Sequence, residues 1–397
     1  MYIQKKNIKI NDRNFLKFFF FSILFISLFS PLPLFSQWAI LMNDADSLVL
    51  EGTDNIYNLE FEKAKEKFEI IKERYPKHPA GYFLDAMIVW WKINLDQDNE
   101  EFDNEFNKKV EKVINVCDET LDTNNYNITA LFFKGGVIGY RARLRIIRND
   151  WFDALKDAET ALDILQKCQQ VAPFNHDIML GTGLYNYFSE KFPQEYPLLK
   201  PLMVFLPKGD KRLGLFQLRA SAKYARYAST ESKVALMQIY YSFENSTYDA
   251  LQIAQELNSK YPDNPYFQRY LGRCYIRMGM NDAADVVWRD VLKKTFTRKR
   301  GYNNLVARES MYYVGVNLMY DQKYKEALKF LKKSVEGSEV IDKKTSGFKI
   351  SALLKIGNIY DKLGDRKTAL KYYNKVLEQD EWNNSHQTAK KYIKTPY

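Results

Sequence analysis

Three arginines on one short stretch are the side chains best suited to recognise a charged group. Arg269, Arg273 and Arg277 follow one another at four-residue intervals, so on a helix they share one face. Each guanidinium group presents a planar fork of donors that fits a carboxylate in a bidentate way. Tyr266 stands about one helical turn before Arg269. These residues predict a basic and aromatic surface for an acidic or aromatic-rich peptide. The alternative is a solvated face whose local ion pairs contribute about 0.2–1 kcal/mol each.

Further basic residues lie in two other stretches. Arg141, Arg145 and Arg148 share one face of a predicted helix, and Arg143 lies among them in the sequence. A solvated face is the plainer interpretation, because arginine is mostly found exposed. The basic residues between 293 and 300 fall in a predicted long turn, where contact with anionic lipid headgroups is the functional alternative. Salt weakens such a contact when the run is isolated and exposed.

The sequence offers no recognisable catalytic centre. His78, His176 and His386 are its three histidines, and no two of them have the spacing of metal ligands. The motifs GxSxG, HExxH and CxxC are absent, and the glycine pairs fall inside predicted helices rather than after a strand. We therefore predict a non-enzymatic protein with no cofactor and no metal. An enzyme with an unfamiliar site in residues 131–227 stays an alternative.

The cysteines point to packing rather than to cross-links. Cys117, Cys168 and Cys274 are widely separated, and each falls in a predicted helix. An odd number without a CxxC pair argues against a disulfide framework and against a zinc site. Free cysteine usually behaves as a small apolar residue, so three buried thiols are expected.

The elements that carry these residues are predicted to be helices in pairs. Between about residues 233 and 380 one pattern recurs four times: an apolar helix, a short turn, and a second helix with a small residue at a fixed place. Glycine and alanine stand twelve residues apart in three copies: Gly272 and Ala284, Gly315 and Ala327, and Gly357 and Ala369. Glycine lets two helices approach closely, and Gly364 suits a left-handed helix end.

This pattern resembles the tetratricopeptide repeat, a family of paired antiparallel helices with a unit of about 34 residues. The resemblance implies an all-α, right-handed solenoid of about eight helix pairs that binds other proteins. It also implies that the arginine face and Tyr266 line the concave groove formed by the first helix of each pair. Tyr312 and Tyr320 occupy equivalent places in the next unit. The groove lacks the Lys/Asn clamp of chaperone-binding relatives, so chaperone docking is not expected.

The N-terminal half carries the same pattern in a less regular form. Two further pairs of small residues mark its helices: Gly52 and Ala64, twelve apart, and Gly135 and Ala154, nineteen apart. The wider spacing predicts that both helices of the third unit are longer. Trp90 and Trp91 are adjacent and cannot share one helix face, so one is expected in the core and the other against the preceding repeat or an open groove.

An apolar insertion with four prolines, residues 189–209, interrupts the fourth unit. If exposed, it is a contact site for a partner or a membrane, because large apolar patches are rarely left in water. The favoured interpretation is that it folds across the array as core, and rapid proteolysis near Lys200 would indicate exposure instead. Residues 131–228, above all the stretch Pro207–Leu218, are similar to the middle of the eukaryotic tetratricopeptide-39 and inclusion-clearance family. That resemblance implies an adaptor-like role.

The N-terminus has the pattern of a secretory signal peptide. Five basic residues precede the apolar run Phe18–Phe29, and a cleavage site after Ser36 is expected. The run is short for a membrane span of about 20 residues, although an uncleaved anchor stays an alternative. The predicted division of the chain is a signal peptide at 1–37, irregular repeats with the insertion at 38–228, and a C-terminal array at 229–397.

The charge of the chain is modest once the signal peptide is removed. Residues 1–37 carry five basic and one acidic residue, so the formal charge of +10 falls to about +6. Such a balance does not require nucleic acid, and none is predicted as a partner. We predict an exported scaffold of the periplasm or cell envelope that holds an acidic protein or peptide in its concave groove. A peripheral membrane or cell-wall adaptor that uses the basic patches is the alternative, and salt-sensitive pelleting with liposomes would favour it.

Overall fold

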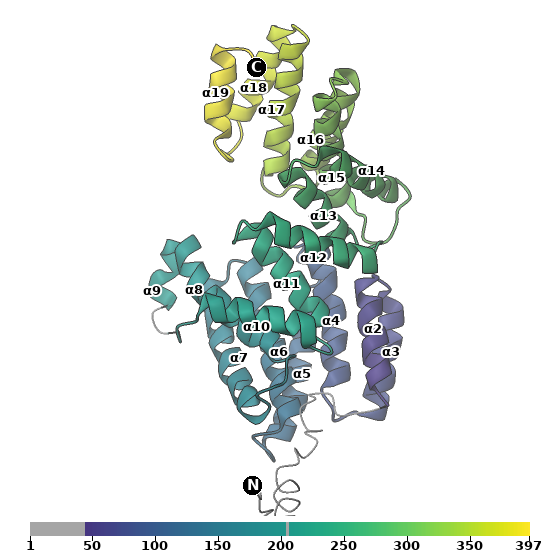
Figure 1. Ribbon diagram of the computed structural model, residues 1–397, viewed down its shortest axis with the longest axis vertical. Coiled ribbons are helices and arrows are strands. Elements are labelled where there is room, and N and C mark those ends of the chain that lie inside the picture. Colours follow the sequence, from purple (N-terminus) through teal and green to yellow (C-terminus); the bar gives the residue numbers. More distant parts are fainter. Residues whose placement is uncertain (1–43, 204–205) are drawn as a thin grey trace, which may run out of the picture.

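The computed structural model describes residues 44–203 and 206–397, and every regular element within them is a helix. The helices follow one another in pairs, each with a first and a second helix (Figure 1). Four pairs come first: α2 (Asp46–Tyr57) with α3 (Phe61–Arg74), α4 (Ala80–Leu95) with α5 (Asp103–Leu121), α6 (Ile128–Ile147) with α7 (Trp151–Val171), and α8 (Met179–Glu195) with α10 (Lys211–Tyr224). Four more follow: α11 (Ser229–Ser242) with α12 (Thr247–Lys260), α13 (Pro265–Arg277) with α14 (Asn281–Phe296), α15 (Asn304–Tyr320) with α16 (Tyr324–Ile341), and α17 (Gly347–Lys362) with α18 (Arg366–Leu377), before the terminal α19 (Ser385–Lys394).

This architecture confirms the predicted all-α solenoid of helix pairs. The right hand expected of its superhelix stays a prediction. The signal peptide predicted for residues 1–37 lies outside the described residues. Among the residues that the structure does describe, no helix combines the length and the apolar character that crossing a membrane requires.

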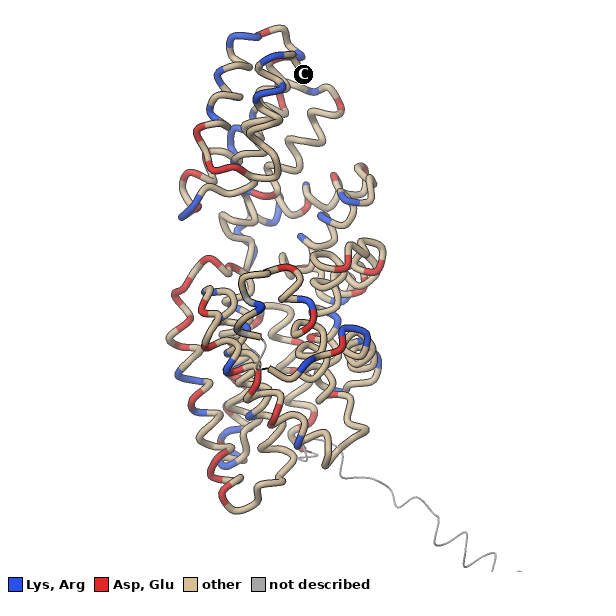
Figure 2. Tube along the Cα trace, turned by 90° about the vertical axis from the view of Figure 1, so that its left-hand side faces the viewer, with Lys and Arg blue, Asp and Glu red and all other residues tan. Residues whose placement is uncertain are grey.

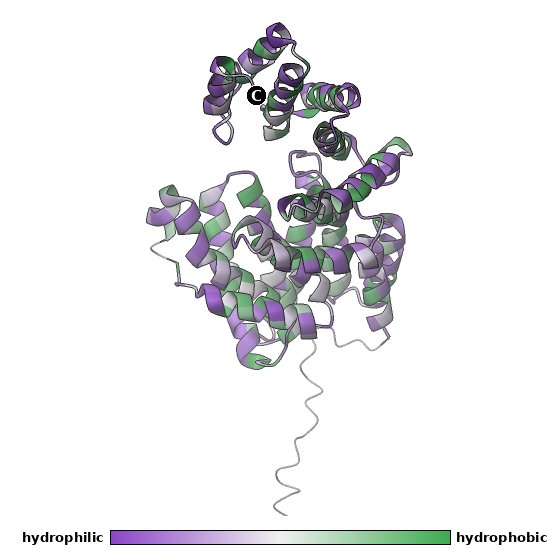
Figure 3. Ribbon diagram, turned by 45° about the horizontal axis from the view of Figure 1, so that its top comes forward, coloured by the Kyte–Doolittle hydropathy of each residue, from purple (hydrophilic) through white to green (hydrophobic). Residues whose placement is uncertain are grey.

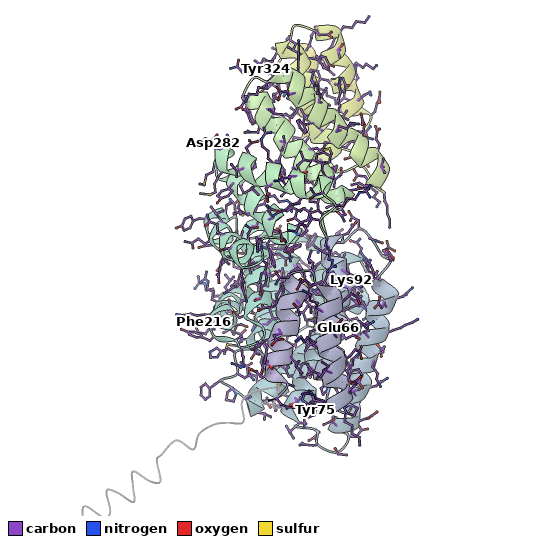
Figure 4. The ribbon with its side chains drawn as sticks, turned by 90° about the vertical axis from the view of Figure 1, so that its right-hand side faces the viewer. Glu66, Tyr75, Lys92, Phe216, Asp282 and Tyr324 are labelled. Carbon is purple, nitrogen blue, oxygen red and sulfur yellow. The ribbon has the colours of Figure 1, made fainter. Side chains whose placement is uncertain are left out.

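The helices pack because each turns an apolar face inward. In α3, Ala64, Phe68 and Ile71 are fully buried, whereas Lys63 and Glu66 are exposed. Glu66 lies on the outer side of the first pair in Figure 4. Hydrophobic and hydrophilic residues mix along the helices throughout the molecule, as expected of helices with one wet side (Figure 3).

Small residues allow the two helices of a pair to touch, as the sequence predicted. A Cβ added to a glycine of the first helix would fall against a large side chain of the second: 2.5 Å from Cε1 of Tyr373 for Gly357, 2.6 Å from Cε2 of Trp288 for Gly272, and 2.8 Å from Cγ of Leu331 for Gly315. Gly364 adopts the left-handed φ of +78° that ends α17. The regular spacing of glycines therefore reflects regular helix crossings.

The third pair is longer, also as predicted. α6 has 20 residues and α7 has 21. Gly135 packs against Leu165, because an added Cβ would lie 2.8 Å from its Cγ. Ala154 is buried at 1% exposure.

The first described helix, α2, closes the first five pairs into a ring. α2 and the turn after it bond to the turns that precede α11, join α12 to α13 and follow α14, about 180 to 240 residues later in the chain. These contacts are Tyr227 Oη to Asp46 Oδ1 (2.6 Å), Tyr261 Oη to Asp54 Oδ1 (2.5 Å), Asn264 Nδ2 to the Tyr57 carbonyl (2.8 Å) and Arg300 Nη1 to the Leu59 carbonyl (2.8 Å). We call the pairs from α2 to α12 the N-terminal ring and helices α13 to α19 the C-terminal arm, which extends beyond the ring in Figure 1. One apolar core runs from Ala45 to Cys274 and crosses the predicted junction at residues 228 and 229, which itself stays a prediction.

Trp90 and Trp91 are both buried and serve the two predicted roles. Trp90 packs in the core beside Tyr140, with ring centroids 5.2 Å apart. Trp91 meets the preceding repeat at Tyr57, also at 5.2 Å, and reaches Phe267 of α13 at 5.6 Å. Trp91 therefore helps to hold the ring closed.

The three cysteines are free and buried, which confirms their prediction as packing residues. Burial raises the pKa of the Cys117 and Cys168 thiols to about 12 and that of Cys274 to about 11. They therefore stay neutral at physiological pH.

The apolar insertion divides between its two predicted alternatives. It contains the single turn η1 (Pro197–Leu199) and the short α9 (Lys200–Met203). Leu198 is 92% exposed, whereas Met203 and Leu206 border the space inside the ring.

We expect Gly357→Ala to lower the free energy of unfolding by about 1–3 kcal/mol, the usual cost of overpacking a filled site. The Tyr373 ring cannot step aside freely, because its hydroxyl donates to Asn358 at 3.0 Å and to Asp361 at 2.8 Å. Urea unfolding followed by circular dichroism measures the change. The control is Gly139→Ala in α6, where the added methyl comes no closer than 3.9 Å to Ala161. A neutral Gly357→Ala would contradict the close crossing.

Candidate functional site

The predicted arginine face lies on α13, which Asn264 caps by accepting a hydrogen bond from the Tyr266 amide at 2.9 Å. Arg269 and Arg273 point from α13 toward α15, where both meet Glu309. Arg269 lies 2.7 Å from Oε2, and Arg273 Nε donates to Oε1 at 2.5 Å. The Glu309 side chain is fully buried, and the two guanidinium side chains are 14% and 21% exposed.

The two arginines keep this carboxylate charged. Burial alone would raise the pKa of Glu309, but attraction to Arg269 and Arg273 outweighs burial and lowers the pKa to about 2. The donors of both arginines thus already hold a carboxylate of their own chain. Arg269 and Arg273 therefore do not form a solvated charged face, and their guanidinium donors are not free to bind a ligand.

The other four predicted residues extend this contact in both directions along the first helices. Toward the ring, the Tyr266 hydroxyl accepts from Gln238 of α11, and Arg277 lies over the Tyr241 ring at 3.7 Å. Toward the C-terminus, Tyr312 packs 5.4 Å from Phe348, and Lys355 lies 5.6 Å from the Tyr320 ring. We call this series of contacts across α11, α13, α15 and α17 the first-helix ladder. Its accessible members are the exposed Arg277, the half-buried Tyr312 and the 58% exposed Tyr320.

Sequence reasoning missed Glu309, although a signal for it exists. Glu309 stands 43 residues after Tyr266, which is the step between the glycines of these two units. It therefore occupies the same groove position one unit later. A carboxylate there, opposite Arg269 and Arg273, is the expected partner for two arginines on the neighbouring first helix.

The other basic groups are also paired within the chain. Arg141 and Arg145 both hold Asp157, at 2.8 and 2.5 Å, and Arg148 holds Asp103 at 2.5 Å. The predicted turn at residues 293–300 begins later than expected, because Lys293 and Lys294 belong to the last turn of α14. Lys294 pairs with Asp290, and Lys299, in the turn after α14, pairs with Asp263. Basic and acidic residues are interspersed along the chain in Figure 2. Arg143 differs from its neighbours, because it turns toward the inside of the ring and stacks on Trp90, 4.8 Å from the ring centroid.

The inside of the ring is a cavity of about 480 Å³. Its walls come from the first helices α2, α4, α6, α8, α11 and α13, with α7 and the insertion at one side. Ring closure has thus gathered the concave face of the first pairs around one partly open cavity. Most lining residues are apolar, and Arg143, Asp177 and Glu231 are the charged ones among the described residues.

The cavity lining carries few ionisable side chains. The described lining residues include no histidine, cysteine or lysine. The Asp177 carboxylate accepts hydrogen bonds from the backbone amides of Tyr227 and Ala228, each at 2.8 Å. No three His, Cys, Asp or Glu residues of the described chain are grouped to hold a metal ion.

Residues 307–381 match the family model of the tetratricopeptide repeat, which covers most of α15 to α18. This segment, which is less than half of the chain, is therefore similar to tetratricopeptide repeats. No curated protein matches it by sequence. The likeness to the tetratricopeptide-39 family stays a prediction.

Three solved structures are similar in fold. They are PilF of Pseudomonas aeruginosa (14% identity, 65% of this chain and 96% of that chain, TM-score 0.43), PilW, a type IV pilus biogenesis factor (14% identity, 64% and 97%, TM-score 0.41), and yeast Tom70 (12% identity, 88% and 81%, TM-score 0.39). At these scores the likenesses carry no argument about what this chain does.

Glu309→Gln is expected to destabilise the protein by about 3–5 kcal/mol at neutral pH, because it leaves two buried guanidinium groups without a charge partner. Folding lowers the pKa of Glu309 from 4.5 to about 2, so its contribution is complete above pH 4.5 and is lost as the pH falls toward 2. Urea unfolding of both proteins across this range measures the difference, which should shrink with falling pH.

The matched control is Glu336→Gln on α16, which removes an ion pair to Lys333 whose side chains are 66% and 59% exposed. Such pairs contribute little, so the control should unfold like the wild type. Equal stability of Glu309→Gln and the control would show that the arginine pair does not depend on Glu309.

Proposed function

We propose that the chain is a non-enzymatic scaffold of the cell envelope, and that its C-terminal arm holds an extended, acidic segment of a protein partner along the first-helix ladder. The repeat match over residues 307–381 and the continuity of the ladder support this proposal. Solenoids present such concave surfaces as extended binding faces.

The six residues predicted for the groove divide into two roles in this proposal. Arg269 and Arg273 set the spacing of α13 and α15, because Glu309 occupies their donors. Tyr266 is 7% exposed and belongs with them as a packing residue. The accessible members contact the partner: Arg277, Tyr312 and Tyr320.

The single observation that carries the proposal is the open end of the ladder at Tyr320. More than half of this large ring is in water, although it lies on the face that successive first helices share. Lys355 stands beside it, 5.6 Å from the ring centroid. A ring that offers apolar area next to an ammonium group suits a segment with an acidic and an apolar side chain.

The envelope location rests on the predicted signal peptide at residues 1–37. Nucleic acid is not part of the proposal, because a nucleic-acid-binding face needs clustered basic residues and both signs are interspersed in the view of Figure 2.

A photo-crosslinking phenylalanine analogue at position 320 is expected to trap one partner in native cells. The same analogue at position 248 is the control, since Tyr248 on α12 is equally open at 60% exposure but lies on a second helix. With the trapped partner purified, the double change Arg277→Ser and Tyr320→Ser should weaken its binding about tenfold or more, as loss of an interface anchor does. Equal trapping at both positions, or unchanged affinity, would contradict the proposed face.

Export is tested by fractionation of cells that make the chain with a C-terminal tag. We expect the tagged protein in the envelope fraction, with its N-terminus following Ser36 by mass spectrometry. Deleting residues 1–37 should retain it in the cytoplasm. An uncut chain in the cytoplasmic fraction would contradict the envelope role and leave the partner face to be judged on its own.

A further inference from the structure

We propose that the cavity inside the N-terminal ring binds one long-chain carboxylic acid, with the carboxylate on Arg143 and the hydrocarbon tail among the aromatic residues of α7 and α8. This site is separate from the partner face of the arm and does not depend on the proposed function. Four features of the cavity support the inference. They are the guanidinium group of Arg143, the hydrogen-bonded carboxylate of Glu231, the aromatic residues of α7 and α8, and the volume.

The first feature is the unpaired cation. Arg143 stands 4.8 Å from the Trp90 centroid and 5.5 Å from that of Tyr140. Within the described residues, its guanidinium group donates no hydrogen bond and makes no direct ion pair, although it attracts the nearby Glu231 carboxylate; Arg141, Arg145 and Arg148, by contrast, all hold a carboxylate directly. A planar donor fork held by two rings at the wall of a cavity matches an incoming carboxylate.

The second feature is the one carboxylate near Arg143. Glu231 of α11 accepts from Trp91 Nε1 at 2.6 Å and from the Tyr57 hydroxyl at 3.4 Å, and Tyr140 bonds to it as well. These donors come from α2, α4 and α6, so they tie the walls together. A cationic ligand would have to displace them, whereas an anionic ligand meets the free donors of Arg143. Burial raises the pKa of Glu231, and the attraction of Arg143 and these three donors partly offsets that rise.

The third feature is a group of aromatic residues from α7 and α8. Trp151 of α7 packs against Phe192 at 6.3 Å and Tyr196 at 5.5 Å, and Phe188 stacks on Phe192 at 4.6 Å. Met203 of α9 completes this side. α8 and α9 lie at one edge of the ring in Figure 1, and α2 and α3 lie toward the other. A charged group in one part of the cavity and a group of aromatic rings in another suit a ligand with one polar head group and one apolar tail.

The fourth feature is size. A volume of about 480 Å³ lies within the range of about 300–1,000 Å³ typical of small-molecule sites. The contacts of α2 with α11 to α13 close the ring around it. A folded partner or a second copy of the chain therefore has no room there, and an extended acyl chain does. Left to water, so large an apolar surface is unfavourable, which favours an occupant.

The test measures binding of radiolabelled palmitate to the purified, delipidated full chain by equilibrium dialysis, with hexadecanol and hexadecylamine as probes of equal tail and different head. We expect saturable binding of one palmitate per chain. Arg143→Met should weaken palmitate about tenfold to a hundredfold, the usual effect of losing charged hydrogen bonds, and leave hexadecanol unchanged. Glu231→Gln should strengthen palmitate binding, because it removes the neighbouring negative charge.

The matched control is Arg212→Met on α10, where the side chain is exposed on the outside of the ring, on the helix whose Phe216 projects from the surface in Figure 4. It should bind palmitate like the wild type, and thermal unfolding should confirm that all variants fold. Absence of palmitate binding to the wild type would overturn the proposal. Equal binding by Arg143→Met and wild type, or preference for hexadecylamine, would overturn the assigned head group.

Discussion

A carboxylate buried between neighbouring first helices is the interaction on which both concave faces depend. In the ring, Glu231 of α11 accepts hydrogen bonds from the Tyr57 hydroxyl of α2 and from the Trp91 indole of α4. In the arm, Glu309 of α15 gathers two arginines from α13. A buried charge is costly unless it is bonded on several sides, so each carboxylate fixes the helices around it. Glycine crossings set the distance within a pair, and these carboxylates set the distance between pairs.

The two carboxylates have opposite consequences because they join helices at different separations in the chain. Glu231 meets Tyr57 across 174 residues and thereby closes a superhelical turn on itself. Glu309 meets Arg273 across 36 residues, between successive pairs, and leaves the turn open. The same repeat unit therefore yields a partly open apolar cavity in the first half and an accessible face in the second. The cavity of the ring suits a small molecule, and the accessible face of the arm suits an extended polypeptide segment.

Local spacing made the fold predictable, and long-range closure made the cavity unpredictable. Twelve-residue steps such as Gly357 to Ala369 are set within one pair, so the sequence alone indicated them. The same holds for the longer α6 and α7 and for the two different environments of Trp90 and Trp91. The inward turn of Arg143, by contrast, follows from α2 meeting α11, which no local pattern records. The pairing of Arg269 and Arg273 with Glu309 also crosses between units, so a face expected to await a ligand is satisfied from within.

The two faces meet at α13, and this meeting explains why its side chains looked like a binding site in the sequence. Tyr270 borders the cavity on one side, and Arg273 lies 5.7 Å from its ring on the other. Tyr266 bonds to Gln238, which also lines the cavity. Aromatic and basic residues alternate on α13 because this helix packs against two neighbours. Its tyrosine Tyr266 contacts α11, and its arginines Arg269 and Arg273 pair with Glu309 of α15. Where a closed turn of a solenoid joins an open one, the joining helix needs both aromatic and basic side chains for its two neighbours. It needs them whether or not it also binds a ligand.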